Sequence, residues 1–124
     1  MADRYYCSAT RLRLRGPRQI LPFLRSSALV TIAARRTPGN VRTRLLGMPP
    51  FPIYFTLTVW ESEEAMRAFV KTPQHREAMA YMDRFARVGT FARFSSDTRR
   101  VGWRRAFREL RTPAGVHPPQ PAKA

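Results

Sequence analysis

The sequence predicts an α+β protein with the ferredoxin-like order β-α-β-β-α-β, a four-stranded antiparallel sheet carrying helices on one face. Residues 53–60 are β-branched or aromatic at almost every position, which is typical of a strand packed on at least one face. The apolar spacing then changes from two residues to about 3.6, and Ser62 can cap a helix that has two glutamates in its first turn. The other elements can be arranged around this strand and helix.

A strand and a helix are predicted before this pair. Residues 5–15 end in strict alternation of leucine and arginine, which indicates a strand that stops at the following glycine and proline. Residues 19–35 have helical apolar spacing, and Pro22 is tolerated because it falls in the first turn. Turn residues at 37–40 end this helix. Its predicted inner face comprises Ile20, Phe23, Leu24, Ser27 and Ala28.

Residues 41–47 predict the second strand, followed by a proline-rich connection at 48–52. Prolines lack the N–H donor that a ladder needs, so this connection is expected to lie over a surface or along the rim of a cleft. Thr72 and Pro73 predict a break and a new helical start. Residues 89–96 predict the fourth strand. The new helical stretch places on one face His75, Ala78, Met79, Met82 and Phe85 or Ala86.

Both faces of the strand at 53–60 carry large or β-branched side chains. Ile53, Phe55, Leu57 and Val59 point one way, and Tyr54, Thr56, Thr58 and Trp60 point the other. Neither set suits solvent, so we expect a second layer against the open sheet face. Another copy of the chain would supply it most economically, and a homodimer is therefore predicted.

Three regions are predicted along the chain: a ferredoxin-like domain at 1–97, a basic extension at 98–111 and a proline-rich, disordered tail at 112–124. In the extension, Trp103, Phe107 and Leu110 fall on one side of a short basic helix. This helix could dock on its own domain, reach across a dimer or touch an anionic surface. Docking suits three apolar residues better than membrane anchoring does.

The composition restricts the class of protein. The length of 124 residues fits a single domain, and arginine interrupts every apolar run before it reaches the length of a membrane span. The polar N-terminus does not resemble a signal peptide, so a cytoplasmic protein is expected. Cys7 is the only cysteine, which excludes an intramolecular disulfide. With two histidines besides, the chain lacks the ligand spacing of a typical metal site.

The net charge of +15 comes almost entirely from arginine, since Lys71 and Lys123 are the only lysines among 23 basic residues. Such a field attracts nucleic acid, anionic membranes or acidic ligands. The basic residues are spread along the whole chain without a recognisable DNA- or RNA-reading motif. An arginine-biased genome that places arginine on ordinary solvated faces explains the charge equally well.

The run Trp60-Glu61-Ser62-Glu63-Glu64-Ala65, followed by Pro73-Gln74-His75, resembles the antibiotic biosynthesis monooxygenase-like family of dimeric α/β-barrel proteins. The resemblance covers about residues 53–94, and the stretch through Met79 is also similar to part of the spheroidene monooxygenase group. It implies a homodimer whose two sheets face each other, with a cavity between each sheet and its own helices. Some members oxidise polyketide-type phenols to quinones with oxygen and no cofactor or metal, whereas others bind or degrade heme.

The heme-degrading branch of this family uses an Asn on the first strand and a Trp and a His ten residues apart. Here the first strand offers Cys7, Ser8 or Thr10, and Phe69 and Met79 stand at the Trp and His positions. That constellation is missing, while simple heme binding through His75 stays open. No cofactor is otherwise expected.

A cofactor-independent oxygenase needs a base that forms the substrate phenolate and donors that hold it. His75 is the best base because its unperturbed pKa lies near neutrality, and the other histidine, His117, falls in the tail. Arg93 could stabilise a developing anion. The candidate catalytic residues are His75, Trp60, Tyr54 and Arg93, and the candidate substrate-binding residues are Phe55, Met66, Phe69, Met79, Tyr81 and Met82.

Each candidate also has a purely structural interpretation. Trp60 could be a packing residue, His75 a solvated first-turn residue, and Arg93 the partner of Glu61 or Glu77. The methionines could be core filler, and Cys7 a small buried residue. The leading hypothesis is a cofactor-independent monooxygenase acting on an apolar aromatic or polyketide-like ligand between sheet and helices. The alternatives are a noncatalytic ligand- or heme-binding dimer of the same fold and an arginine-rich protein that binds nucleic acid or another anion.

Overall fold

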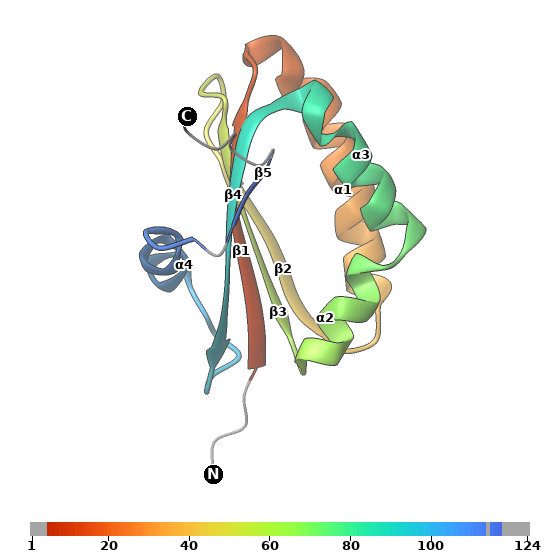
Figure 1. Cartoon of the computed structure of the whole chain (residues 1–124), viewed down its shortest axis with the longest axis vertical. Helices are drawn as coiled ribbons and strands as arrows, with labels where there is room; N and C mark the ends of the chain where they lie inside the picture. Colours follow the sequence, from red (N-terminus) through yellow and green to blue (C-terminus); the bar gives the residue numbers. More distant parts are fainter. Residues whose placement is uncertain (1–4, 114, 118–124) are drawn as a thin grey trace, which may run out of the picture.

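The computed structural model describes residues 5–113 and 115–117, without the side chains of residues 81–83 and 115–117. Its elements, shown in Figure 1, are β1 (Tyr5–Leu14), η1 (Pro17–Gln19), α1 (Ile20–Arg36), β2 (Asn40–Gly47), β3 (Ile53–Trp60), α2 (Glu63–Val70), α3 (Pro73–Phe85), β4 (Ala86–Ser96), α4 (Trp103–Leu110) and β5 (Gly115–His117). The predicted α+β, ferredoxin-like fold is confirmed.

The strands form one antiparallel sheet in the order β2-β3-β1-β4-β5. Ser8 of the central strand β1 is paired with Thr58 of β3 on one side and with Arg93 of β4 on the other. Directly paired residues share a face of the sheet, so these three side chains point the same way. Helices α1, α2 and α3 cover that face, and α4 lies on the opposite one (Figure 1).

Helix α4 provides a second layer over the sheet within the same chain. Its Phe107 ring meets Phe55 of β3 with ring centroids 4.8 Å apart. The apolar cluster between α4 and the sheet comprises Cys7, Ala9, Leu57, Val59, Phe94, Val101 and Ala106. Much of the apolar sheet face that the sequence pattern assigns to a second copy is therefore covered by α4.

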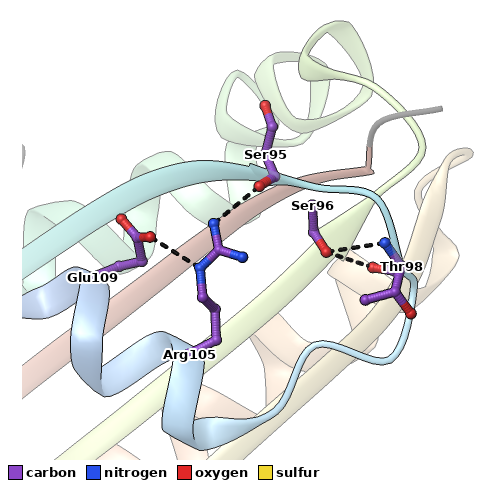
Figure 2. Close-up of polar contacts among 5 residues, drawn as sticks. All are labelled: Ser95, Ser96, Thr98, Arg105 and Glu109. Atoms are coloured by element: carbon purple, nitrogen blue, oxygen red, sulfur yellow. Dashed lines mark hydrogen bonds and ion pairs between the residues drawn. The ribbon is translucent and has the colours of Figure 1, made fainter. Parts of the chain in front are cut away.

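Arg105 ties α4 to the end of β4 (Figure 2). Its guanidinium donates hydrogen bonds to the Ser95 carbonyl oxygen at 3.1 Å and to Glu109 Oε2 at 2.9 Å. The same group lies over the Phe94 ring, 4.7 Å from its centroid. One cation thus joins an ion pair, a backbone hydrogen bond and a cation–π contact, which together hold the helix in place.

Two turns direct the chain around the sheet. Gly39 has a φ of +91°, and a Cβ at this position would lie 2.5 Å from the Cβ of Ala65, so only glycine fits between α1 and β2. After β4, Ser96 Oγ donates to the Thr98 carbonyl oxygen at 2.8 Å and accepts from the Thr98 N–H at 3.1 Å (Figure 2). This turn brings the chain back toward α4.

The junction between α2 and α3 places His75. Ser62 caps α2, because its Oγ accepts a hydrogen bond from the Ala65 N–H at 3.1 Å. Thr72 Oγ1 donates to the Phe69 carbonyl oxygen at 2.7 Å and accepts from the His75 N–H at 3.3 Å. Thr72 therefore closes α2 and caps α3, as predicted, and holds His75 in the first turn of α3.

Two boundaries differ from the sequence prediction. Strand β4 begins at Ala86 rather than at residue 89, because its early residues complete the ladder with β1. The predicted disordered tail contains the short strand β5, which pairs with residues 89–91 of β4. The edge of β4 presents backbone groups that can pair with another strand. The residues between Pro113 and Pro118 have the N–H donors that such pairing needs, whereas the prolines do not. The rest of the predicted tail, at 118–124, lies outside the described residues.

The described helices do not reach the dimensions of a membrane span. Helix α1, with 17 residues, is the longest helix in the described part of the chain. Neither α1 nor another described helix combines the length and the apolar character of a membrane-spanning segment.

Candidate functional site

A cavity of about 540 Å³ lies between the sheet and helices α1, α2 and α3. The sheet contributes hydroxyl groups to its wall, from Ser8, Thr10, Thr43, Thr56 and Thr58. The helices contribute mainly apolar side chains, including Val30, Ala34, Met66, Phe69, Val70 and Met79. A flat ligand in this space would meet hydrogen-bonding groups on one side and an apolar wall on the other, which is typical of small-molecule sites.

The charged groups that line the cavity are basic. Arg76 and Arg93 contribute to the lining, and none of the lining residues that the structure describes is Asp or Glu. Arg44 also lines the cavity, but its guanidinium lies on the opposite sheet face, 5.8 Å from the centroid of the Trp103 ring of α4. The Arg93 guanidinium lies 5.5 Å from the centroid of the Phe91 ring. Among the described side chains, neither Glu61 nor Glu77 forms an ion pair with it. The cavity therefore favours an anionic ligand or an anion formed during reaction.

His75 is a neutral base at the side of this cavity. Its ring contacts Phe69 edge-on, with centroids 5.1 Å apart. Burial, and then the positive charge of Arg93, lower the pKa of His75 from its ordinary value of 6.5, and a hydrogen bond to the Val70 backbone opposes this shift. A lowered pKa leaves the imidazole unprotonated at neutral pH, where it can accept a proton from a ligand.

Trp60 lines the same cavity and is completely buried. Its ring stacks on Phe69 with centroids 5.3 Å apart and an interplanar angle of 28°. Its Nε1–H is buried and has no hydrogen-bond partner. Buried donors in folded proteins are nearly always paired, so this unpaired N–H is exceptional, and a small movement of the packed side chains around it would let it donate to a ligand oxygen.

The structure brings most of the predicted site residues together. The cavity lining includes His75, Trp60, Arg93, Met66, Phe69 and Met79. Phe69 lies between the two candidate functional rings, in contact with both Trp60 and His75. The side chains of Tyr81 and Met82, also predicted to bind substrate, lie outside the described residues.

Two predicted site residues lie elsewhere. Tyr54 is buried in a core cluster against Phe23, with ring centroids 5.0 Å apart, and is not part of the described cavity lining. Phe55 is on the opposite sheet face, against Phe107 of α4. Its assignment as a substrate-binding residue is corrected, because neighbouring residues of a strand point to opposite faces and the cavity uses the face of Trp60.

The hydroxyl-bearing wall is the part of the site that sequence reasoning missed. Ser8 and Thr10 of β1 alternate with the buried Cys7 and Ala9, so the pattern of one strand separates the two faces. Only the register with β3, which pairs Ser8 with Thr58 and Thr10 with Thr56, shows that these hydroxyls form one surface. A row of small hydroxyl residues on a strand face covered by helices would have been the indication.

The remaining reactive group, Cys7, faces away from the cavity. It is buried beneath α4, and burial raises the pKa of its thiol to about 11. Such a thiol is protonated at neutral pH and does not act as a nucleophile. In the described part of the chain, no three His, Cys, Asp or Glu side chains are placed to hold a metal ion together.

Part of the chain matches a known protein family. Residues 25–81 match the family model of the antibiotic biosynthesis monooxygenases, a stretch that contains Trp60, Phe69 and His75. No curated protein sequence matches the chain significantly.

Solved structures have the same fold. SnoaB of Streptomyces nogalater, a cofactor-independent oxygenase, is 21% identical, with a TM-score of 0.62 over 77% of this chain and 94% of that one. A candidate antibiotic biosynthesis monooxygenase of Nitrosomonas europaea is 13% identical, with a TM-score of 0.68 over 77% and 92%. Rv0793 of Mycobacterium tuberculosis is 12% identical, with a TM-score of 0.68 over 74% and 94%. At these identities the likeness shows the fold alone.

The chain thus carries the ferredoxin-like fold of the antibiotic biosynthesis monooxygenases, and the family resemblance seen in its sequence is confirmed. The narrower similarity to the spheroidene monooxygenase group stays a prediction.

Proposed function

We propose that this protein is a cofactor-independent monooxygenase that oxidises an aromatic or polyketide-like phenol in the cavity between its sheet and helices α1–α3. One observation carries the proposal: a histidine with a lowered pKa and an arginine line the same cavity, beside an unpartnered indole N–H. A base, a cation and a donor are the groups that formation of a phenolate requires.

In the proposed reaction, neutral His75 takes the phenolic proton, and the positive charge of Arg93 favours the phenolate that forms. The phenolate is electron-rich enough to pass an electron to oxygen, so reduction of oxygen needs no external donor. For a substrate such as an anthrone, a ring CH₂ becomes C=O and the second oxygen atom leaves as water. The substrate supplies all the electrons, which balances the step without a cofactor.

The walls of the cavity would hold and orient the substrate. The Trp60 Nε1–H and the hydroxyls of Thr56 and Thr58 can donate to ring oxygens, while Met66 and Phe69 provide an apolar surface for the rings. Fixing both ends of a flat ligand places its reacting carbon reproducibly, which contributes to rate through orientation. SnoaB, which has the same fold, is a cofactor-independent oxygenase, and this supports a reaction without a resident cofactor in the present protein.

The test is oxygen uptake with an anthrone or a hydroxynaphthacene as substrate, measured on protein treated with a chelator and free of heme and flavin absorbance. We expect turnover in the wild type and a loss of at least about 100-fold in kcat/KM for His75→Ala, the usual scale of general-base catalysis. Gln74→Ala, an exposed neighbour in the same helical turn, is the matched control.

Unchanged kcat/KM in His75→Ala would remove the base assignment. Activity that depends on added heme, or a Soret band that appears on heme addition and tracks activity, would contradict the cofactor-independent mechanism.

We also propose that the protein forms a homodimer through the sheet face that carries α4, as dimers are common in this family. Leu46 is paired with Phe55, whose ring contacts Phe107, so these residues form one apolar surface. Leu46 and Phe107 remain 37% and 39% exposed. Light scattering should give a dimer for the wild type and a monomer for Leu46→Ser/Phe107→Ser, and a monomeric wild type would contradict the proposal.

A further inference from the structure

The outward side of α1 carries exposed aliphatic residues among arginines. Leu21, Leu29 and Ile32 are 77%, 62% and 47% exposed. At about 100° per residue they share one side of the helix, about a third of its circumference, with exposed arginines. We call this surface the outer α1 face, and it consists of Leu21, Arg25, Ala28, Leu29, Ile32, Arg35 and Arg36. Exposed apolar residues grouped in this way indicate a surface that contacts another body.

The charge on α1 itself has a single sign. Every charged residue from Arg4 to Arg44 is an arginine, and no acidic residue occurs between Asp3 and Glu61. Helix α3, which packs beside α1, adds exposed Arg76 and Arg84 and, among the side chains that the structure describes, the exposed carboxylate of Glu77; its sequence also contains Asp83. The outer α1 face is therefore cationic and apolar at once, through Arg25, Arg35 and Arg36 beside its aliphatic residues.

This combination selects among possible partners. A second copy seated symmetrically on the same face would place the arginines of one α1 helix near those of the other, with no acidic residue on α1 to pair with them, which is repulsive. Nucleic acid would use the arginines but would leave Leu21 and Leu29 in water. A bilayer with anionic phospholipids accommodates both, because aliphatic side chains enter the acyl boundary and arginines reach the phosphates.

The outer α1 face also borders a groove that shares lining residues with the cavity. A groove between α1 and β2 is lined by Ala28, Ile32 and Arg35 from the helix and by Leu45 from the strand. Leu45 also lines the main cavity, as do Ser27, Thr31, Thr43 and Arg44 of the same groove. Arg35 spans the groove, since its guanidinium donates to the Thr43 carbonyl oxygen at 3.3 Å.

We propose that the outer α1 face docks on bilayers containing anionic phospholipid, and that a lipophilic substrate passes from the bilayer into the cavity through the groove between α1 and β2. The passage of substrate rests on the function proposed above, whereas docking does not. Ile32 takes part in both, because it lies on the docking face and at the edge of the groove.

Vesicle co-sedimentation tests the docking. Wild-type protein should bind vesicles that contain phosphatidylglycerol and not vesicles of phosphatidylcholine alone, and added salt should weaken the binding. Leu29→Ser/Ile32→Ser should lower affinity at least about tenfold. Met48→Ser/Phe51→Ser is the matched control, since these side chains are 69% and 63% exposed but lie on the β2–β3 connection. It should bind as the wild type does.

A second pair of variants separates local charge from net charge. Arg25→Gln/Arg36→Gln removes two charges from the outer α1 face, and Arg104→Gln/Arg108→Gln removes two exposed charges from α4, on the far side of the sheet (Figure 1). Only the first pair should weaken vesicle binding markedly. Equal losses in the two pairs, equal losses in the two apolar pairs, or no binding to anionic vesicles would overturn the docking.

Two further outcomes would assign the face to another partner and also overturn docking. One is self-association that Leu29→Ser/Ile32→Ser abolishes; the other is salt-sensitive binding of DNA or RNA without vesicle binding.

His75→Ala should bind vesicles as the wild type does, so an inactive protein that still docks separates failure of the proposed function from failure of docking. If turnover occurs, Leu29→Ser/Ile32→Ser should slow oxidation of vesicle-embedded substrate and not of substrate in detergent micelles; equal rates would overturn the passage through the groove.

Discussion

The positive charge of Arg93 acts on His75 across the cavity wall, and after burial it is the second cause of the lowered pKa of that histidine. Removing the charge in Arg93→Gln should therefore raise the pKa of His75 toward 6.5. Because the base must be neutral, the acid limb of the kcat/KM profile should move to higher pH by the same amount. Proton NMR titration in a His117→Gln background measures the pKa directly.

Arg76→Gln is the control for this prediction, because Arg76 lines the same cavity but is not a cause of the His75 shift. An acid limb that moves equally in both variants would show that general charge, and not Arg93, sets the pKa. An unchanged His75 pKa in Arg93→Gln would contradict the effect of the Arg93 charge on His75.

Trp60→Phe tests the unpartnered indole N–H. Phenylalanine keeps an aromatic ring against Phe69 but cannot donate a hydrogen bond. If the Nε1–H binds a ligand oxygen, ligand affinity should fall about fivefold, as expected for loss of one hydrogen bond of about 1 kcal/mol. Isothermal titration with a substrate analogue measures this, and an analogue lacking the oxygen should bind both proteins equally.

Tyr54→Phe should leave activity unchanged and make the protein as stable or more stable. The Tyr54 hydroxyl is buried without a hydrogen-bond partner, so its removal relieves an unpaired polar group worth about 1 kcal/mol. Urea unfolding gives the free energy, and steady-state rates give the activity. A fall in kcat without a fall in stability would restore the catalytic assignment that the sequence suggested for Tyr54.

These variants also show how far sequence reasoning could reach. The change of period after Trp60 and the cap at Ser62 are local features, and they predicted the strand, the helix and the fold correctly. His75 and Trp60 could be chosen from chemistry alone, because few residues in this chain can act as a base or an indole donor. The junction that Thr72 closes holds His75 at the cavity, whereas Trp60 is placed there by the end of β3.

The choice between the two faces of β3 could not be made locally. Tyr54 and Phe55 are adjacent aromatics, and only packing of α4 on one side and α1–α3 on the other separates their roles. Tyr54 does share the cavity face with Trp60, but it lies toward the other end of the strand, where Phe23 closes the space. Position along a strand relative to the helices above it is a tertiary property that strand periodicity does not contain.

Arg105→Ala tests whether α4 protects Cys7. The wild-type thiol should react very slowly with a disulfide reagent, because it is buried and burial raises its pKa to about 11. Removing Arg105 breaks its contacts with Glu109, Ser95 and Phe94, so stability should fall by roughly 1–2 kcal/mol and α4 should open more often. Labelling should then be about ten times faster, with exposed Arg104→Ala as the control.

The pKa of Cys7 adds a stability test with a defined sign. The folded thiol holds its proton to about pH 11, whereas the unfolded thiol loses it near its ordinary value of 9.0. The contribution to stability is therefore complete below pH 9 and is lost as pH rises toward 11, so the free energy of unfolding should fall in this window. Cys7→Ala should lack this part of the fall. Identical pH dependence in the two proteins would show that Cys7 is not held in the protonated state beneath α4.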